Sequence, residues 1–172
     1  MVDIKRAYFN ATIDPSEPPT FAQLPEEDPD HETMAGQLLR HMYGTRAAAD
    51  GWQEEYSTFL VSIGFKQGEA SANVFHHASR GITTSVHGDD FTSSGPSDSL
   101  DWLEASLTAK YECTISPRMG PGPHDAKEGR VLNRILRMKE HSIECDPRQV
   151  ERLIAECGLA GPTGHHVQGG GC

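Results

Sequence analysis

Residues 82–93 read Ile-Thr-Thr-Ser-Val-His-Gly-Asp-Asp-Phe-Thr-Ser: a β-branched run, a glycine with two acids, and a second short run. The run up to His87 is rich in β-branched residues, which are typical of a strand. Gly88 allows the chain to reverse tightly, which places the acid pair Asp89 and Asp90 at a strand–turn–strand. This stretch therefore predicts an antiparallel hairpin.

The segments around this hairpin are predicted to be its neighbours in a sheet. Residues 73–77 form a strand-like run, and the turn signal Ser79-Arg80-Gly81 joins it to the first hairpin strand. Val2-Asp3-Ile4-Lys5, followed by Ala7-Tyr8-Phe9, is typical of a strand running into a turn, and residues 112–115 are a further short strand. A strand that begins at residue 2 needs partners, so we expect this chain to be a piece of a longer protein.

Two amphipathic helices are predicted to cover the sheet. Thr45 is the expected N-cap of the first, which ends at Gly64. Its apolar stripe consists of Trp52, Tyr56, Phe59, Leu60 and Ile63. The second helix begins at Ser97 and Asp98. Its apolar face carries Leu100, Leu103, Leu107 and Tyr111. We interpret the aromatic residues as core, with a base-stacking platform as the alternative. The element order predicts an α+β fold, an antiparallel sheet with helices packed on one face.

The C-terminal third predicts smaller elements. Beyond a glycine- and proline-rich loop at 116–129, residues 131–138 and 142–145 predict a second hairpin. Asp146 is the expected N-cap of a final helix. Residues 160–172 are predicted to form a disordered tail.

The composition narrows the function classes. With 15 Lys and Arg against 25 Asp and Glu, the chain has a formal net charge of −10, the wrong sign for a general electrostatic grip on a phosphate backbone. Residues 14–32 hold five prolines and seven acids and predict an acidic surface loop, a solvated connector or a partner-binding segment. No apolar run is long enough for a membrane span or a signal peptide, so we expect a soluble, intracellular protein that does not contact a membrane.

The cysteines and histidines offer weaker alternatives. Cys113, Cys145, Cys157 and Cys172 lack metal-knuckle or redox-motif spacing and are predicted to be reduced thiols. A two-histidine, one-carboxylate iron site from His76-His77, His87 and Asp89 is disfavoured, because neighbouring residues on a strand face opposite ways. Arg40, Arg46 and Lys66 are ordinary surface charges or contacts to template phosphates.

The acids Asp3, Asp89 and Asp90 are the most specific chemical feature. The acid pair lies 86 residues after Asp3, and the turn at Gly88 would let it converge with the first strand. Carboxylates brought together repel one another, and hard divalent cations such as Mg²⁺ are the usual counter-charge. An acid pair alone is also typical of a solvated turn.

The surrounding residues resemble the reverse transcriptase of copia-type LTR retrotransposons. The matching blocks, in order, are Val2-Asp3-Ile4-Lys5-Arg6-Ala7-Tyr8-Phe9-Asn10, Arg40-His41-Met42-Tyr43-Gly44-Thr45-Arg46, Gly51-Trp52 with residues 59–66, Val86-His87-Gly88-Asp89-Asp90-Phe91, and Asp146-Pro147-Arg148-Gln149-Val150-Glu151-Arg152-Leu153-Ile154. They cover roughly residues 2 to 159, which the resemblance identifies as a partial domain of the polymerase palm type, without its fingers.

The resemblance implies a role for each matching residue. Asp3 and Asp89 would ligate two Mg²⁺ ions, for which Mn²⁺ can substitute, and Asp90 would complete the acidic cluster. Tyr8 matches the aromatic residue that screens out ribonucleotides. The implied nucleotide-binding residues are Ile4, Lys5, Arg6, Ala7 and Tyr8. The implied template or primer contacts are Arg46, His87 and Gly88.

The resemblance also implies what a whole enzyme would contain. An RNA or DNA template-primer and a deoxynucleoside triphosphate would be its ligands, in the cytoplasm within a virus-like particle or in the nucleus. The family's basic fingers region, connection and RNase H domain are absent from this sequence. Ala47-Ala48-Ala49-Asp50 replaces the family's Gln-Ser-Pro-Arg. The alternatives to a polymerase fragment are an inactive remnant or non-enzymatic interaction module and, more distantly, a metal-dependent phosphohydrolase.

Overall fold

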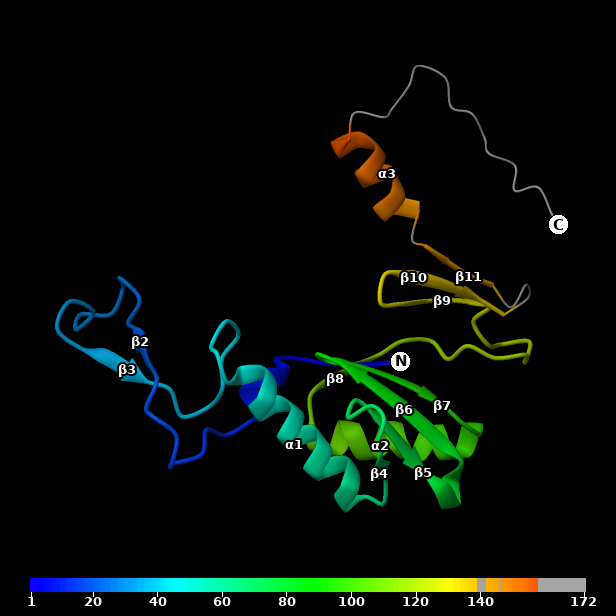
Figure 1. The fold of residues 1–172 in the computed structure, drawn as a ribbon, viewed down its shortest axis with the longest axis horizontal. Coiled ribbons are helices and arrows are strands. Elements are labelled where there is room, and N and C mark those ends of the chain that lie inside the picture. Colours follow the sequence, from blue (N-terminus) through cyan, green and yellow to red (C-terminus); the bar gives the residue numbers. More distant parts are fainter. Residues whose placement is uncertain (139–141, 146, 158–172) are drawn as a thin grey trace. The chain divides into compact units, whose positions relative to one another are not determined.

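An antiparallel sheet of six strands organises the first part of the chain (Figure 1). The strands are β1 (Val2–Ile4), β4 (Lys66–Gln67), β5 (Val74–His77), β6 (Ile82–His87), β7 (Asp90–Ser94) and β8 (Cys113–Ile115). Their order across the sheet is β4-β5-β6-β7-β1-β8, and every neighbouring pair is antiparallel. The predicted pairing of residues 73–77 with the run after Gly81 and the predicted hairpin at Gly88 are confirmed, and β1 lies between β7 and β8.

Two helices, α1 (Ala48–Ser62) and α2 (Ser97–Lys110), pack on one face of this sheet. Strand residues alternate between this core and the opposite face; in β6, for example, Ile82, Thr84 and Val86 are buried and the residues between them are exposed. The helices contribute the stripes predicted for them. The largest fully buried side chains of this core are Trp52, Phe75, Phe91, Ile4, Leu60 and Ile82. The aromatic stripe of α1 is therefore core, and the chain has the expected α+β fold.

Along the chain, β1, α1, β6, β7, α2 and β8 follow one another in the order of a split β-α-β unit. In this arrangement β1 lies between β7 and β8, so residues far apart in sequence become sheet neighbours. Here Asp3 on β1 is brought against Asp90 on β7.

The predicted cap of the first helix is wrong. The residue at the N-cap of α1 is Ala47, which makes no side-chain hydrogen bond to the helix. Thr45 does not cap the helix, because its hydroxyl donates to the Met42 carbonyl at 2.8 Å. The end of the helix agrees with the prediction, since Gly64 follows it in the left-handed region at φ 101°.

The acidic segment at 14–32 is not wholly irregular. Strand β2 (Phe21–Gln23) pairs with β3 (Ala35–Gln37) as a separate two-stranded sheet. Phe21 is 59% exposed, so the pairing does not bury an apolar core. The backbone bonds of β2 thus form in the longest proline-free stretch of this segment, residues 20–24.

The structure is a computed structural model that describes residues 1–138, 142–145 and 147–157. It divides into two compact units, Met1–Ser116 and Pro117–Cys172. Within the second unit, β9 (Glu128–Val131), β10 (Arg134–Arg137) and β11 (Ser142–Cys145) form a three-stranded sheet, and α3 (Pro147–Glu156) follows.

The single strand predicted over 131–138 is wrong, because it contains a turn. Leu132 and Asn133 have φ values of 48° and 60°, the two positive values of a type I′ turn, and Val131 faces Arg134 across it. The hairpin with 142–145 and the final helix are confirmed. The predicted cap Asp146 and the predicted tail lie outside the described residues.

No helix in the described ranges has the length and apolarity that a bilayer crossing requires. Cys113 and Cys157 are free thiols.

Gly51 in α1 gives a first test of the packing. A Cβ at this position would lie 2.2 Å from Nε2 of His41, whose ring is buried at 3% exposure and cannot swing away cheaply. Gly→Ala within a helix ordinarily stabilises by roughly 0.5–1 kcal/mol. We expect Gly51→Ala instead to destabilise by about 1–3 kcal/mol, as overpacking does. Urea denaturation measures it, and in a His41→Ala background the sign should reverse; destabilisation in both backgrounds would contradict the contact.

Candidate active site

The turn between β6 and β7 carries two of the predicted acids. Gly88 and Asp89 are its central residues, and His87 pairs with Asp90 on either side of them. Only the first central residue has a positive φ, 60° at Gly88, which is the pattern of a type II′ turn. The Gly88 carbonyl accepts a hydrogen bond from Nε1 of Trp52 at 2.7 Å, so helix α1 holds the turn from the core side.

Asp3 and Asp90 are directly opposed on neighbouring strands. The Ile4 N–H donates to the Asp89 carbonyl at 2.9 Å, which makes Asp3 and Asp90 a non-hydrogen-bonded pair, the kind whose side chains lie closest. Both flank residues that are buried under the helices, so both project from the opposite face of the sheet. The pairing of β1 with β7 thus brings two carboxylates side by side that are 87 residues apart in the sequence.

This arrangement is electrostatically costly. Partial burial, and then the charges of Asp89 and Asp3, raise the pKa of Asp90 above its ordinary value of 3.8, and His87 offsets this only in part. Like charges directly opposite each other on a sheet destabilise the pair. The charges of Asp3 and Asp89 therefore both act on Asp90.

Replacing Asp90 by Asn should stabilise the fold. Because the pKa of Asp90 is raised, the folded state resists ionisation, and this penalty on stability appears as the pH rises through the raised pKa. We expect Asp90→Asn to increase the free energy of unfolding by about 0.2–1 kcal/mol near neutral pH, and to leave it unchanged in acid where the carboxyl is protonated in both states. Urea denaturation at the two pH values measures this, with the exposed Glu69→Gln as control. A loss of stability at neutral pH would show that the two acids do not repel.

The described aspartates do not form a ready ligand cage. Within the described part of the chain, no group of three or more His, Cys, Asp or Glu side chains gathers closely enough to hold a metal ion. Asp3 and Asp90 are brought together, whereas Asp89 stands in the turn beside them. As donors, carboxylate oxygens fit a hard divalent cation. For Asp89 to act as a third ligand, its side chain would have to rotate toward Asp3 and Asp90.

Two tyrosines adjoin the acids. Tyr8 lies in the 3₁₀ turn Ala7–Asn10 that follows β1, and its ring meets that of Tyr43 edge to face with centroids 4.4 Å apart. Partial burial, then the charge of Asp89, raises the pKa of Tyr43, although the Ala7 N–H that bonds its oxygen acts the other way. Tyr43 was not singled out from the sequence, because only the fold brings residue 43 beside residues 3, 8 and 89.

The predicted nucleotide-binding segment is largely committed to the fold. Ile4 and Ala7 are fully buried, and the Lys5 N–H donates to the Glu112 carbonyl at 2.9 Å. Arg6 takes the left-handed conformation at φ 53° and turns the chain out of β1. The backbone donors of Ile4, Lys5 and Ala7 are therefore occupied, and the side chains of Lys5 and Arg6 are the groups left to contact a ligand.

Lys5 and Arg6 share one carboxylate. Both bind Glu112, at 2.9 and 2.6 Å, and all three side chains are about half exposed or more. Together with Phe9 and Asn10 they line a hollow of about 490 Å³. Two cations and one anion leave this hollow with a positive charge.

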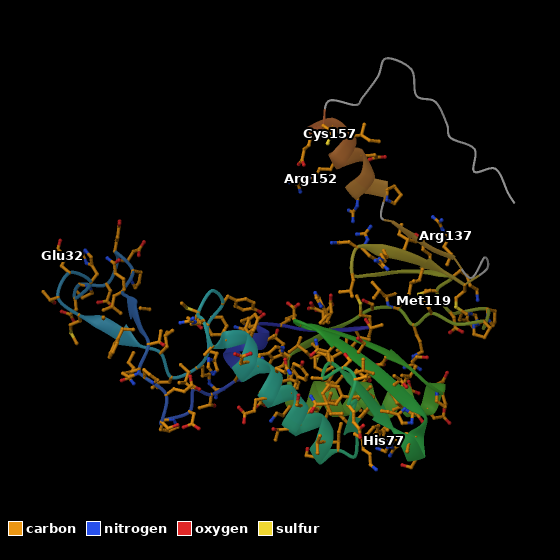
Figure 2. All side chains as sticks on the ribbon, in the orientation of Figure 1. Glu32, His77, Met119, Arg137, Arg152 and Cys157 are labelled. Atoms are coloured by element: carbon orange, nitrogen blue, oxygen red, sulfur yellow. The ribbon has the colours of Figure 1, made fainter. Side chains whose placement is uncertain are left out.

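The other residues predicted to bind template, primer or a metal lie apart from the acids or form contacts within the fold. Arg46 is exposed before α1. Arg40 donates to the Asn10 carbonyl at 3.1 Å. His76 is exposed, while His77, labelled in Figure 2, is buried between Phe65 and Trp102, so the pair faces opposite ways and offers no iron site.

Comparison with models of protein families, with curated proteins and with solved structures finds no match to this chain.

Proposed function

We propose that this chain is the palm segment of a copia-type reverse transcriptase, and that Asp3, Asp89 and Asp90 form its site for adding deoxynucleotides to a primer. The observation that carries the proposal is the in-register opposition of Asp3 and Asp90 beside the turn that bears Asp89. Two carboxylates directly opposite each other destabilise a sheet, because their charges repel. A bound divalent cation would neutralise these charges, so the same repulsion favours binding of the cation.

The arrangement of the six-stranded sheet supports a palm-like fold. A palm-like sheet requires an antiparallel sheet with helices on one face and the acids on the other. Helices α1 and α2 fill one face here, and Asp3 and Asp90 project from the other. The side of the sheet that holds the acids is thus the side left for a primer terminus.

Each neighbouring group has a task in this proposal. Divalent cations would activate the primer hydroxyl and stabilise the leaving phosphate. Asp3 and Asp89 would supply oxygen ligands, Asp90 would complete the acidic cluster, and Trp52 fixes the turn through the Gly88 carbonyl. Tyr8, braced by Tyr43, is placed to contact the sugar. Lys5 and Arg6 offer the positive hollow for the triphosphate, once Glu112 releases them.

The proposal includes the regions that would bind the template. Because this chain has a net charge of −10, the positive charge that binds template phosphates would come from the fingers, connection and RNase H portions of a retroelement polyprotein. In this scheme the chain contributes the metal site.

The experiment is primer extension on an RNA template with deoxynucleoside triphosphates and either Mg²⁺ or Mn²⁺. We expect products longer than the primer that require both the metal and the triphosphates. Ca²⁺, which binds oxygen ligands with looser geometry, is the metal control. Metal-dependent cleavage of a simple phosphodiester without extension would instead assign a phosphohydrolase.

A second candidate is a non-catalytic retroelement remnant that serves as an interaction module. The observation that favours it is the lack of a gathered ligand group among the described residues. Binding of metal without extension or cleavage would favour this candidate.

A further inference from the structure

A second hollow, remote in sequence from the three aspartates, lies along the N-terminal half of α1. It has a volume of about 600 Å³, and residues 11–17 form its other wall. Its lining includes five acids and no Lys or Arg. The acids are Asp14, Glu17, Asp50, Glu54 and Glu55. Negative charge therefore collects here without a cation in the wall.

Two of these carboxylates are already engaged. Glu55 binds the Lys110 ammonium at 2.9 Å, and the Ser16 N–H donates to Asp14 at 2.7 Å, which lowers the pKa of Asp14. Within the described residues, Glu17, Asp50 and Glu54 have no ion-pair partner. These three carboxylates are available to a ligand.

His41 is a separate indication of a ligand. It lines the hollow and is only 3% exposed, yet among the described residues its imidazole has no hydrogen-bond partner. The one completely enclosed side-chain polar atom without a partner in this part of the chain is Ser57 Oγ, so the imidazole nitrogens must retain an opening. The hollow is the space that His41 lines, and an imidazole nitrogen without a proton offers a lone pair to an N–H donor.

The acids of the hollow are spread along its walls. The described carboxylates and His41 do not gather into a ligand group. Asp50 and Glu54 lie on successive turns of α1, with Cβ atoms roughly 5–6 Å apart. Separated anions and an acceptor suit N–H donors on a flexible alkyl chain better than a compact ion.

We infer that this hollow binds an alkylammonium group, with Asp50, Glu54 and Glu17 as counter-ions and His41 as a hydrogen-bond acceptor. Free polyamines and lysine side chains of a partner protein present the same chemistry. The inference is independent of the polymerase proposal, because it uses none of the residues of that site.

Isothermal titration of the full chain with spermidine, and separately with a short lysine-rich peptide, tests the inference. We expect at least one probe to bind and Asp50→Asn/Glu54→Gln to weaken that binding at least tenfold. The matched double variant Glu26→Gln/Glu27→Gln removes the same charge from the exposed acidic segment and should bind as the wild type does. Binding of spermidine alone would identify a polyamine site, and binding of the peptide alone a lysine site.

The imidazole provides a second readout that a general charge effect would not move. The side-chain ¹⁵N resonances of His41 should shift as the probe saturates, and the same probe concentration should leave them unshifted in Asp50→Asn/Glu54→Gln. Three results would each overturn the inference: neither probe binds, both double variants lose affinity equally, or the His41 resonances stay fixed while a probe binds.

Discussion

Asp89→Asn is expected to reduce Mg²⁺-dependent primer extension roughly 100-fold or more, the usual cost of removing a group that stabilises developing charge in a transition state. The substitution keeps the size of the side chain and its place in the type II′ turn. It removes the negative charge that acts on both Asp90 and Tyr43. The loss should therefore appear in the rate of extension rather than in folding.

Two controls make this result specific. Asp98→Asn removes an exposed acid from the first turn of α2 and should leave extension unchanged. Asp3→Asn should match the loss in Asp89→Asn, because Asp3 faces the same pair from β1. Extension by Asp89→Asn at the wild-type rate would remove these aspartates from the chemistry.

Trp52→Ala is expected to cost about 3–5 kcal/mol of folding free energy, as for a large aromatic residue removed from a core. Trp52 is 1% exposed, and its ring meets those of Tyr56, Phe91 and Tyr111. Small domains have only about 5–15 kcal/mol in total. Urea denaturation should show a large fall in the midpoint.

Trp52→Phe separates the hydrogen bond from the packing. Phenylalanine retains an aromatic ring but cannot donate to the Gly88 carbonyl, whose loss of a partner costs about 1–3 kcal/mol. Hydrogen exchange should then accelerate at residues 87–90 more than at the far end of β6. Unchanged exchange in the turn would show that Trp52 supports the core alone.

Most of the first unit could be predicted from local patterns. The β-branched residues of 82–87 indicated the strand β6, and the spacing of Trp52, Tyr56 and Leu60 identified the buried face of α1. The helical signal is strong because burial acts on every third or fourth residue of a helix. The acids at the hairpin turn were located because Gly88 marks the turn.

The errors lie where one local contact decides between alternatives. Thr45 has the chemistry of a cap, but its hydroxyl bonds back to Met42. The turn at Leu132 and Asn133 lacks the glycine that usually marks a type I′ turn. The opposition of Asp3 and Asp90 depends on which strands become neighbours, and that pairing joins segments too distant for a local pattern to specify.

Mn²⁺ titration followed by ¹⁵N NMR tests whether the three aspartates bind a metal, because paramagnetic broadening locates a bound metal whether or not the chain extends a primer. Amide signals near Asp3 and residues 88–91 should broaden first, Mg²⁺ should reverse the broadening, and Asp3→Asn/Asp89→Asn should abolish it. Broadening centred instead on Asp50 and Glu54, or no selective broadening at all, would contradict a metal site at the three aspartates.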